Sequence, residues 1–168
     1  MELLIPGLIL VALMVWASTR IKKTAAAAFD AETIETAEYS IRKPEGFLHV
    51  LGDTKHELTA YSREFCEETS KDRRANIEID VFPDTSVKTI RDDIRRSAID
   101  SKLEYQEDDI CELTTEETAN QTSFTAFYKI VGRGNVSYRL RFAVATDHLE
   151  EYVNTIKDTV DSFTVKNL

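Results

Sequence analysis

Residues 123–144 read SFTAFYKIVGRGNVSYRLRFAV, a stretch that predicts two long neighbouring strands. Apolar residues alternate along both halves, and Gly132-Arg-Gly-Asn135 between them is typical of a hairpin connection. In the first half, Phe127 and Val131 add apolar side chains to the second face, so we expect this strand to be covered on both faces. The second half alternates apolar residues with serine and arginine. The first strand of the pair is therefore expected at the centre of a mainly antiparallel sheet.

Upstream of this hairpin, the pattern predicts a further strand and then a helix. Asn76–Phe82 alternates isoleucine and valine with acidic residues, as a half-buried strand does. After Pro83, apolar residues recur at helical spacing over 87–98, and Asp84 or Ser86 can cap this helix. Shorter strands are expected at 38–43, 47–51, 58–65 and 110–115.

Downstream of the hairpin, residues 147–163 predict the last helix. Its apolar residues share one helical face, and Asp147 has the spacing of a capping box with Glu150. The order of elements is thus strands, helix, strands, helix, joined mostly by short turns. This order predicts an α+β fold for residues 39–168, with a mainly antiparallel sheet flanked by helices.

The composition divides the chain into two unlike parts. Its 168 residues suit one domain of ordinary size, and 21 basic and 30 acidic residues give a net charge of −9. Residues 1–28 hold one of the acids and three of the bases, so the remainder is more acidic than the average. This remainder lacks the basic footprint that phosphate binding needs, which argues against a nucleic-acid partner.

The first part is an apolar leader. No charge interrupts residues 3–19. As a helix they would span roughly 26 Å, close to the thickness of a bilayer core. Trp16 lies where the membrane–water interface would fall. We expect residues 1–19 to be an uncleaved transmembrane anchor that contacts the lipid bilayer through 3–19. Two alternatives stay open: a buried core helix, and a signal peptide cleaved after Ala17 or Ala28.

The bases that follow the leader indicate its orientation. Arg20, Lys22 and Lys23 lie on its C-terminal side, so the positive-inside rule places the acidic domain in the cytoplasm. This predicts a single-pass protein of a bacterial-type inner (plasma) membrane, with a periplasmic or other extracytoplasmic domain as the alternative. Residues 20–38 are expected to form a juxtamembrane spacer. Residues 1–65 contain no cysteine, which excludes a lipidated cysteine behind the leader.

Two short motifs in the acidic part resemble a known family. Near its start stands Tyr39-Ser-Ile-Arg-Lys-Pro-Glu-Gly-Phe47, and near its end Val160-Asp-Ser-Phe-Thr-Val165. Segments of this kind open and close members of the PsbP-like family, which includes photosystem II extrinsic subunits, bacterial envelope lipoproteins and a Ran-binding nuclear-import accessory protein. The resemblance implies an α/β/α sandwich over 39–165 and an accessory or assembly role. The chain departs from the lipoproteins in lacking a lipidated cysteine, and from the plant members in lacking a transit peptide.

Sequence motifs of catalysis are absent. The 5 glycines form no phosphate-binding fingerprint, and neither Gly-x-Ser-x-Gly nor His-Glu-x-x-His occurs. Cys66 and Cys111 are expected to be thiols in the cytoplasm, and a disulfide between them is open if the domain is exported. The acidic pairs Asp108-Asp109 and Glu116-Glu117 are expected in solvated loops.

The histidines offer the alternative that carries chemistry. His49 and His56 flank a turn at Gly52-Asp53 and could approach each other across a hairpin. With Asp53 or Glu57 they could hold a metal ion such as Zn²⁺ in a small hydrolase or ligand-binding enzyme. The simpler interpretation is a pair of solvated histidines beside a loop, with no metal, cofactor or catalytic residue.

A basic stripe on the helix at 87–98 is a further candidate for binding. Lys88, Arg91 and Arg95 form it, and it could meet an acidic partner or membrane phosphates. The alternative is a solvated face balanced by neighbouring acids, with Asp92 paired to Arg96. The whole sequence favours a single-pass, membrane-anchored, non-enzymatic binding or assembly module, with an unknown membrane protein as its partner.

Overall fold

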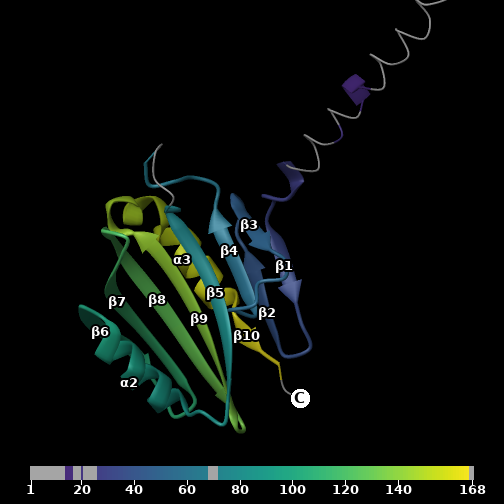
Figure 1. Ribbon diagram of the computed structural model, residues 1–168. Coiled ribbons are helices and arrows are strands. Elements are labelled where there is room, and N and C mark those ends of the chain that lie inside the picture. Colours follow the sequence, from purple (N-terminus) through teal and green to yellow (C-terminus); the bar gives the residue numbers. More distant parts are fainter. Residues whose placement is uncertain (1–13, 17–19, 21–25, 68–71, 167–168) are drawn as a thin grey trace, which may run out of the picture.

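The computed structural model describes residues 14–16, 20, 26–67 and 72–166. Within these residues the strands form two sheets (Figure 1). The larger sheet has seven strands in the order β3-β4-β5-β9-β8-β7-β6, and all neighbouring strands are antiparallel. Its strands are β3 (Phe47–Val50), β4 (Leu58–Ser62), β5 (Ala75–Pro83), β6 (Asp100–Gln106), β7 (Ile110–Ala119), β8 (Thr122–Arg133) and β9 (Val136–Ala145). The smaller sheet has the order β1-β2-β10, from β1 (Glu32–Glu35), β2 (Tyr39–Lys43) and β10 (Thr164–Val165).

Two helices cover opposite faces of the larger sheet, α2 (Val87–Ser97) and α3 (Leu149–Ser162) (Figure 1). The alternation along β8 serves both: Phe127 and Val131 pack on the α3 side, and Ala126 and Ile130 are buried on the α2 side. β8 and β9 pair from Phe124–Ala145 to Arg133–Val136 and lie inside the sheet. The predictions of an α+β fold and of a strand at 123–131 that is central and covered on both faces are therefore confirmed.

The two helices begin differently. Ser86 caps α2 as predicted, because its side chain accepts a hydrogen bond from the Thr89 backbone N–H at 3.2 Å. The capping box predicted for α3 is wrong. Asp147 lies in a 3₁₀ turn, η1 (Thr146–His148), and the residue that caps α3 is His148, without a side-chain hydrogen bond to the helix backbone.

The ion pair predicted on α2 has a different partner. Arg96 pairs with Asp93, three residues earlier, and Asp92 instead accepts from the neighbouring Arg91, with 2.7 Å between Asp92 Oδ1 and Arg91 Nη2. Each arginine takes the nearest carboxylate that its side chain reaches. The two acidic side chains of this helix are therefore both paired with an arginine close by in the chain.

Two strands lie where the sequence predicted none. β6 forms the end of the larger sheet, and its residues are almost all exposed, so hydrophobic alternation gives little signal there. β1 lies inside the stretch 20–38 that was expected to be a spacer, and it pairs with β2. Of its residues only Ile34 packs on the core. The folded domain therefore includes residues 32–35.

The motifs at the two ends of the domain meet in the smaller sheet. Gly46 has a φ of +83°, a left-handed conformation that favours glycine, which explains the turn at Pro44-Glu-Gly46. At the other end, the Phe163 ring lies 6.1 Å from the Tyr39 ring, and β10 pairs with β2. These motifs thus serve a turn and the core, as their residue types suggest.

The chain just before β1 is attached to the domain by a buried lysine. Lys43 is only 2% exposed, and its ammonium donates to the backbone oxygens of Ala28 at 3.2 Å, Asp30, and Phe47 at 2.8 Å. The Gly46 backbone N–H also donates to the Phe29 oxygen, at 2.7 Å. We call these contacts the Lys43 attachment. They hold residues 28–30 against the turn between β2 and β3.

The anchor predicted for residues 3–19 lies outside the described residues except for Met14–Trp16, which are helical. Among the residues that the structure does describe, none of the helices is long and apolar enough to cross a bilayer.

Candidate functional site

An apolar groove lies on the α3 side of the larger sheet. It has a volume of about 450 Å³ and opens between α3 and the strands β6, β7 and β8. Its apolar wall and floor come from these side chains: Phe127, Leu149, Val153, Ile156 and Val160. A volume of this size is within the range of ligand sites in proteins.

The groove exists because α3 does not cover the whole sheet. The helix packs against β2, β8 and β9. One flank of its apolar face is therefore buried, with Ile156 5% exposed, while Val153 on the other flank is 55% exposed. A large apolar side chain that is half open to water beside further apolar groups marks a surface suited to binding.

The two walls of the groove carry different charges. On the β6–β7 wall, Glu104 and Glu112 line the groove, and Asp100 pairs in register with Glu116 on the same face. Lys102, which pairs with Glu104 at 3.0 Å, is the base on this wall. The α3 wall is balanced, because it contributes one lysine and one aspartate, Lys157 and Asp161. The groove is thus apolar inside and acidic along its strand wall.

On β8, Lys129 closes the floor of the groove towards the helix. Its Nζ atom donates to the Val160 backbone oxygen at 3.0 Å and lies 3.8 Å from a Glu112 carboxylate oxygen. Its side chain is only 15% exposed. This charge therefore serves the packing of α3 more than it offsets the acidic wall.

On the opposite face, β5 and β9 carry two clusters of charged side chains. In the first, Arg139 Nη2 and His56 Nδ1 each lie 2.6 Å from a different carboxylate oxygen of Asp80. His49 lies in register with Ala60 and, by strand alternation, on the other face of the sheet. The two histidines are therefore separated by the sheet, and the proposed metal site between them does not form.

The remaining members of that hypothesis are also engaged elsewhere. Asp53 accepts hydrogen bonds from the Thr59 hydroxyl and from the Lys55 backbone N–H, at 2.5 and 2.9 Å. These bonds hold the pKa of its carboxyl below the usual range. Among the described residues, no group of three or more histidine, cysteine or acidic side chains could hold a metal ion.

The second charged cluster centres on Arg141. Its guanidinium donates to Glu78 at 3.1 Å and to Glu117 at 2.6 Å, and the Tyr128 hydroxyl donates to Glu117. Burial alone would raise the pKa of Glu117, but the Arg141 charge and these hydrogen bonds outweigh it and hold that pKa below its usual value. Glu117, expected in a loop, is thus part of a strand network.

These clusters leave little polar chemistry unused. Among the described residues, all buried side-chain nitrogen and oxygen atoms have hydrogen-bond partners. On the basic stripe, Arg91 donates to Asp92 and to Gln106, at 2.7 Å each. Arg91 of the stripe therefore interacts with neighbouring side chains of the same domain, as the solvated-face alternative expected in part.

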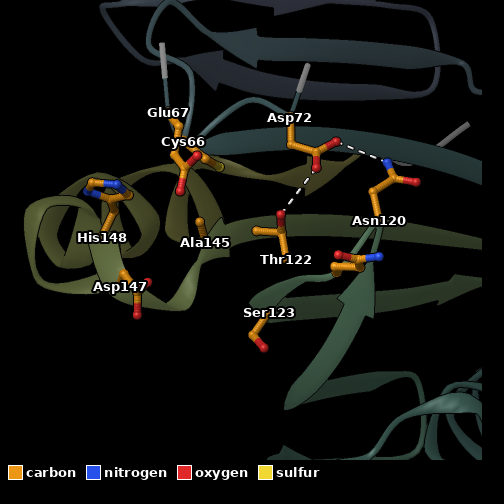
Figure 2. A pocket seen from close by; sticks show the side chains of 10 residues that line it. Cys66, Glu67, Asp72, Asn120, Thr122, Ser123, Ala145, Asp147 and His148 are labelled. Atoms are coloured by element: carbon orange, nitrogen blue, oxygen red, sulfur yellow. Dashed lines mark hydrogen bonds between the residues drawn. The ribbon is translucent and has the colours of Figure 1, made fainter. Parts of the chain in front are cut away.

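A polar hollow of about 570 Å³ lies at one end of the sheet, beside the turn between β7 and β8 (Figure 2). There Asp72 accepts hydrogen bonds from the Asn120 amide at 3.0 Å and the Thr122 hydroxyl at 3.2 Å. Cys66 and His148 lie on its other side (Figure 2). Burial raises the pKa of the Cys66 thiol, and His148 Nδ1 lies 3.0 Å from Glu151, so neither is arranged as a nucleophile with its base.

The two cysteines are free in this structure. Cys66 lines the hollow near Asn120, whereas Cys111 is buried near the start of β7. The nine steps of strand from Cys111 to Asn120 span about 30 Å. A disulfide requires Cα atoms within about 7 Å, so the pairing left open for an exported domain is incompatible with this fold.

Comparison with known proteins places the fold. No family model matches the sequence, and no curated protein matches it either. Solved structures do match: the Ran-binding protein Mog1p of Saccharomyces cerevisiae has 10% identity and a TM-score of 0.55, over 82% of this chain and 96% of that one. LpqN of Mycobacterium tuberculosis, described as involved in cell envelope biogenesis, has 8% identity and a TM-score of 0.55, over 82% and 91%. PsbP (CyanoP) of Synechocystis sp. PCC 6803 has 10% identity and a TM-score of 0.50, over 82% and 94%.

These neighbours confirm the resemblance to the PsbP-like fold. At 8–10% identity, the likeness shows the fold alone. The groove itself was missed by sequence reasoning. The sequence pattern placed Val153 with the other apolar residues on one face of this helix, and the width of that apolar face was the signal available.

Proposed function

We propose that this chain is a membrane-anchored, non-enzymatic binding or assembly module that takes its partner in the groove beside α3. The observation that carries the proposal is a difference between two kinds of surface. The side chains of the polar clusters have hydrogen-bond partners within the chain, whereas Val153 and the apolar side chains beside it line a groove that is open to water. Apolar surface is what a partner gains most from covering.

The anchor rests on the leader and on how the domain begins. Residues 3–19 carry no charge and precede three bases, which favours a single pass with the domain on the cytoplasmic side. The Lys43 attachment supports this, because it fixes the chain at residues 28–30 and leaves few residues between the bases and the domain.

The fold supports the accessory role by analogy. Mog1p is described as Ran-binding and LpqN as involved in cell envelope biogenesis; neither description is of catalysis. The LpqN description also favours a second candidate, an exported envelope protein whose leader is removed. The intact mass of the isolated protein distinguishes it, since a mature chain beginning at Ser18 or Phe29 would contradict the anchor.

The anchor is tested by washing membranes that contain the full-length chain with high salt and then with alkaline carbonate. We expect the chain to stay with the membranes, and a Leu10→Asp, Leu13→Asp variant to be released. A Leu10→Ala, Leu13→Ala variant is the matched control and should stay bound. Release of the unaltered chain by carbonate would contradict the anchor.

The side of the membrane is tested by protease protection on intact and on opened cells. Cleavage of the domain only after the cells are opened supports the proposed cytoplasmic orientation. Cleavage from the outer side of intact membranes would favour the extracytoplasmic alternative.

A further inference from the structure

We infer that the groove receives a short segment of a partner protein in which aliphatic side chains are flanked by lysine or arginine. The inference rests on the proposed binding role of the groove and names the class of its partner. Two features carry it: the apolar floor and the acidic strand wall.

The floor selects aliphatic side chains. Phe127 from β8 and Val153 and Val160 from α3 face the same space of about 450 Å³. Within the floor, the Lys129 ammonium is already bonded to the Val160 backbone oxygen. A polar or charged group placed on this floor would lose water without gaining a partner, whereas an aliphatic group gains from its transfer out of water.

The wall selects basic flanks. Glu104 and Glu112 have side chains 44% and 36% exposed, and Asp100 and Glu116 beside them are exposed as well. Lys102 offsets Glu104, and Lys129, 3.8 Å from a Glu112 carboxylate oxygen, offsets Glu112 in part, so Asp100 and Glu116 contribute most of the negative charge that remains on this wall. Lysine or arginine on either side of the aliphatic residues would therefore meet carboxylates at the rim, where charge pairing contributes to specificity and to the rate of association.

The same wall disfavours anionic surfaces. The net charge of the whole chain is −9, and residues 1–28 contribute positively to it, so the domain is more acidic still. Phosphate-bearing lipids and nucleic acids would be repelled as they approach the wall. A protein segment with basic flanks is attracted by the field that repels them.

The free edge of β6 is a poorer docking site than the groove. The register between β6 and β7 shifts between Leu103 and Tyr105, which places an irregularity in the edge strand. Charged side chains at Asp100, Lys102 and Glu104 follow this edge. Bulges and charges of this kind block the addition of a further strand, so the groove is the site that the structure leaves open.

The test measures the binding of fluorescein-labelled peptides to the full-length chain in nanodiscs of zwitterionic lipid, by fluorescence anisotropy. The probes are KKLLVLKK, its acidic counterpart EELLVLEE and its polar counterpart KKSSNSKK. We expect KKLLVLKK to bind at least tenfold more tightly than either counterpart. Equal binding of the acidic or the polar peptide, or no binding of any of the three, would overturn the inference.

Variants locate the binding. Val153→Glu should weaken KKLLVLKK at least tenfold, while Leu51→Glu, at a side chain 85% exposed and outside the groove lining, should leave it unchanged. Glu104→Lys combined with Glu116→Lys should shift the preference towards EELLVLEE. Glu32→Lys with Glu45→Lys changes the net charge by the same amount at residues that do not line the groove, and should not shift this preference.

Two further results would overturn the inference. One is loss of KKLLVLKK binding in both charge-reversed variants alike, since net charge alone would then explain it. The other is binding of the chain to vesicles of anionic lipid through the groove, shown by a loss in Val153→Glu. The membrane wash tests the anchor independently, so failure of the anchor and failure of the groove are distinguishable.

Discussion

The two faces of the larger sheet are covered in different ways. On the α2 side, β5 and β9 carry arginines and carboxylates that cover the part of the sheet beside the helix and bond to each other. On the α3 side, the same strands carry apolar side chains beneath a helix, and part of the apolar surface stays open beside β7.

Because of this difference, one face contributes to the stability of the domain and the other offers surface for binding. The charged face has its groups satisfied within the chain, so a partner there would have to replace bonds that already exist. The apolar face offers surface whose burial costs no existing bond. The pairs of arginine and carboxylate bond to each other on the part of this face that no helix covers.

The largest effect is expected from the buried part of the apolar face. Phe142 is 0% exposed and its ring lies 5.6 Å from that of Phe47. Phe142→Ala should lower the free energy of unfolding by about 4 kcal/mol, because it leaves a cavity in the core. Urea denaturation followed by circular dichroism measures this. A loss below about 1 kcal/mol would mean that this face is not the main core.

The charged face should respond nearly as strongly to the loss of one member. Arg141→Met leaves Glu78 and Glu117 without their counterion, at side-chain exposures of 18% and 23%, and should cost about 3 kcal/mol. Replacing all three residues with methionine should recover most of that loss, since no buried charge is then unpaired. If the triple variant is as unstable as the single one, the network is more than a self-satisfied cluster.

The pH dependence of Glu117→Gln gives a smaller effect on the same face. The pKa of the Glu117 carboxyl in the folded protein is below the ordinary 4.5. The stabilisation that this carboxylate gives the folded state is therefore complete above pH 4.5 and is lost as the pH falls through the lowered pKa. We expect the variant to be less stable than the unaltered chain by about 2 kcal/mol at pH 7. The two unfolding free energies should converge as the solution is acidified below pH 4.5. A difference that stays constant to low pH would argue against an ionic role.

The smallest effect on stability is expected in the groove. Val153 is 55% exposed, so Val153→Ser should change the free energy of unfolding by less than about 0.5 kcal/mol. The exposed Arg95, changed to alanine, serves as the control on the other helix. The same valine substitution should weaken binding of the KKLLVLKK peptide, and a large loss of stability instead would assign Val153 to the core.

The sequence predicted the elements whose side chains alternate against a core. The hairpin of β8 and β9, strand β5 and both helices follow from such patterns, because burial imposes period 2 or 3.6 on them. β6 and β1 were not predicted, because edge strands bury few side chains and so show little alternation. In β1, for example, only Ile34 is partly buried. Short motifs, Tyr39 to Phe47 and Val160 to Val165, predicted the family fold.

The candidate site could be predicted less well. The partners of His56 and Asp53 are residues 24 and 6 positions away, Asp80 and Thr59, and the sequence alone does not bring the first pair together. The groove depends on how far α3 shifts across the sheet, which is a property of packing. An apolar helix face indicates that some surface is buried but not which flank remains open.

The Lys43 attachment has a geometric consequence for a chain tethered at its N-terminus. If the membrane segment ends at Thr19 and the attachment holds the chain from residue 28, eight residues join them, which reach about 27 Å when fully extended. A tether this short keeps the domain within one domain diameter of the bilayer. Its search for partners then becomes two-dimensional, and a partner in the same membrane is met at a high effective concentration. Weak contacts in the groove are sufficient under that condition, since proximity contributes what the interface area does not.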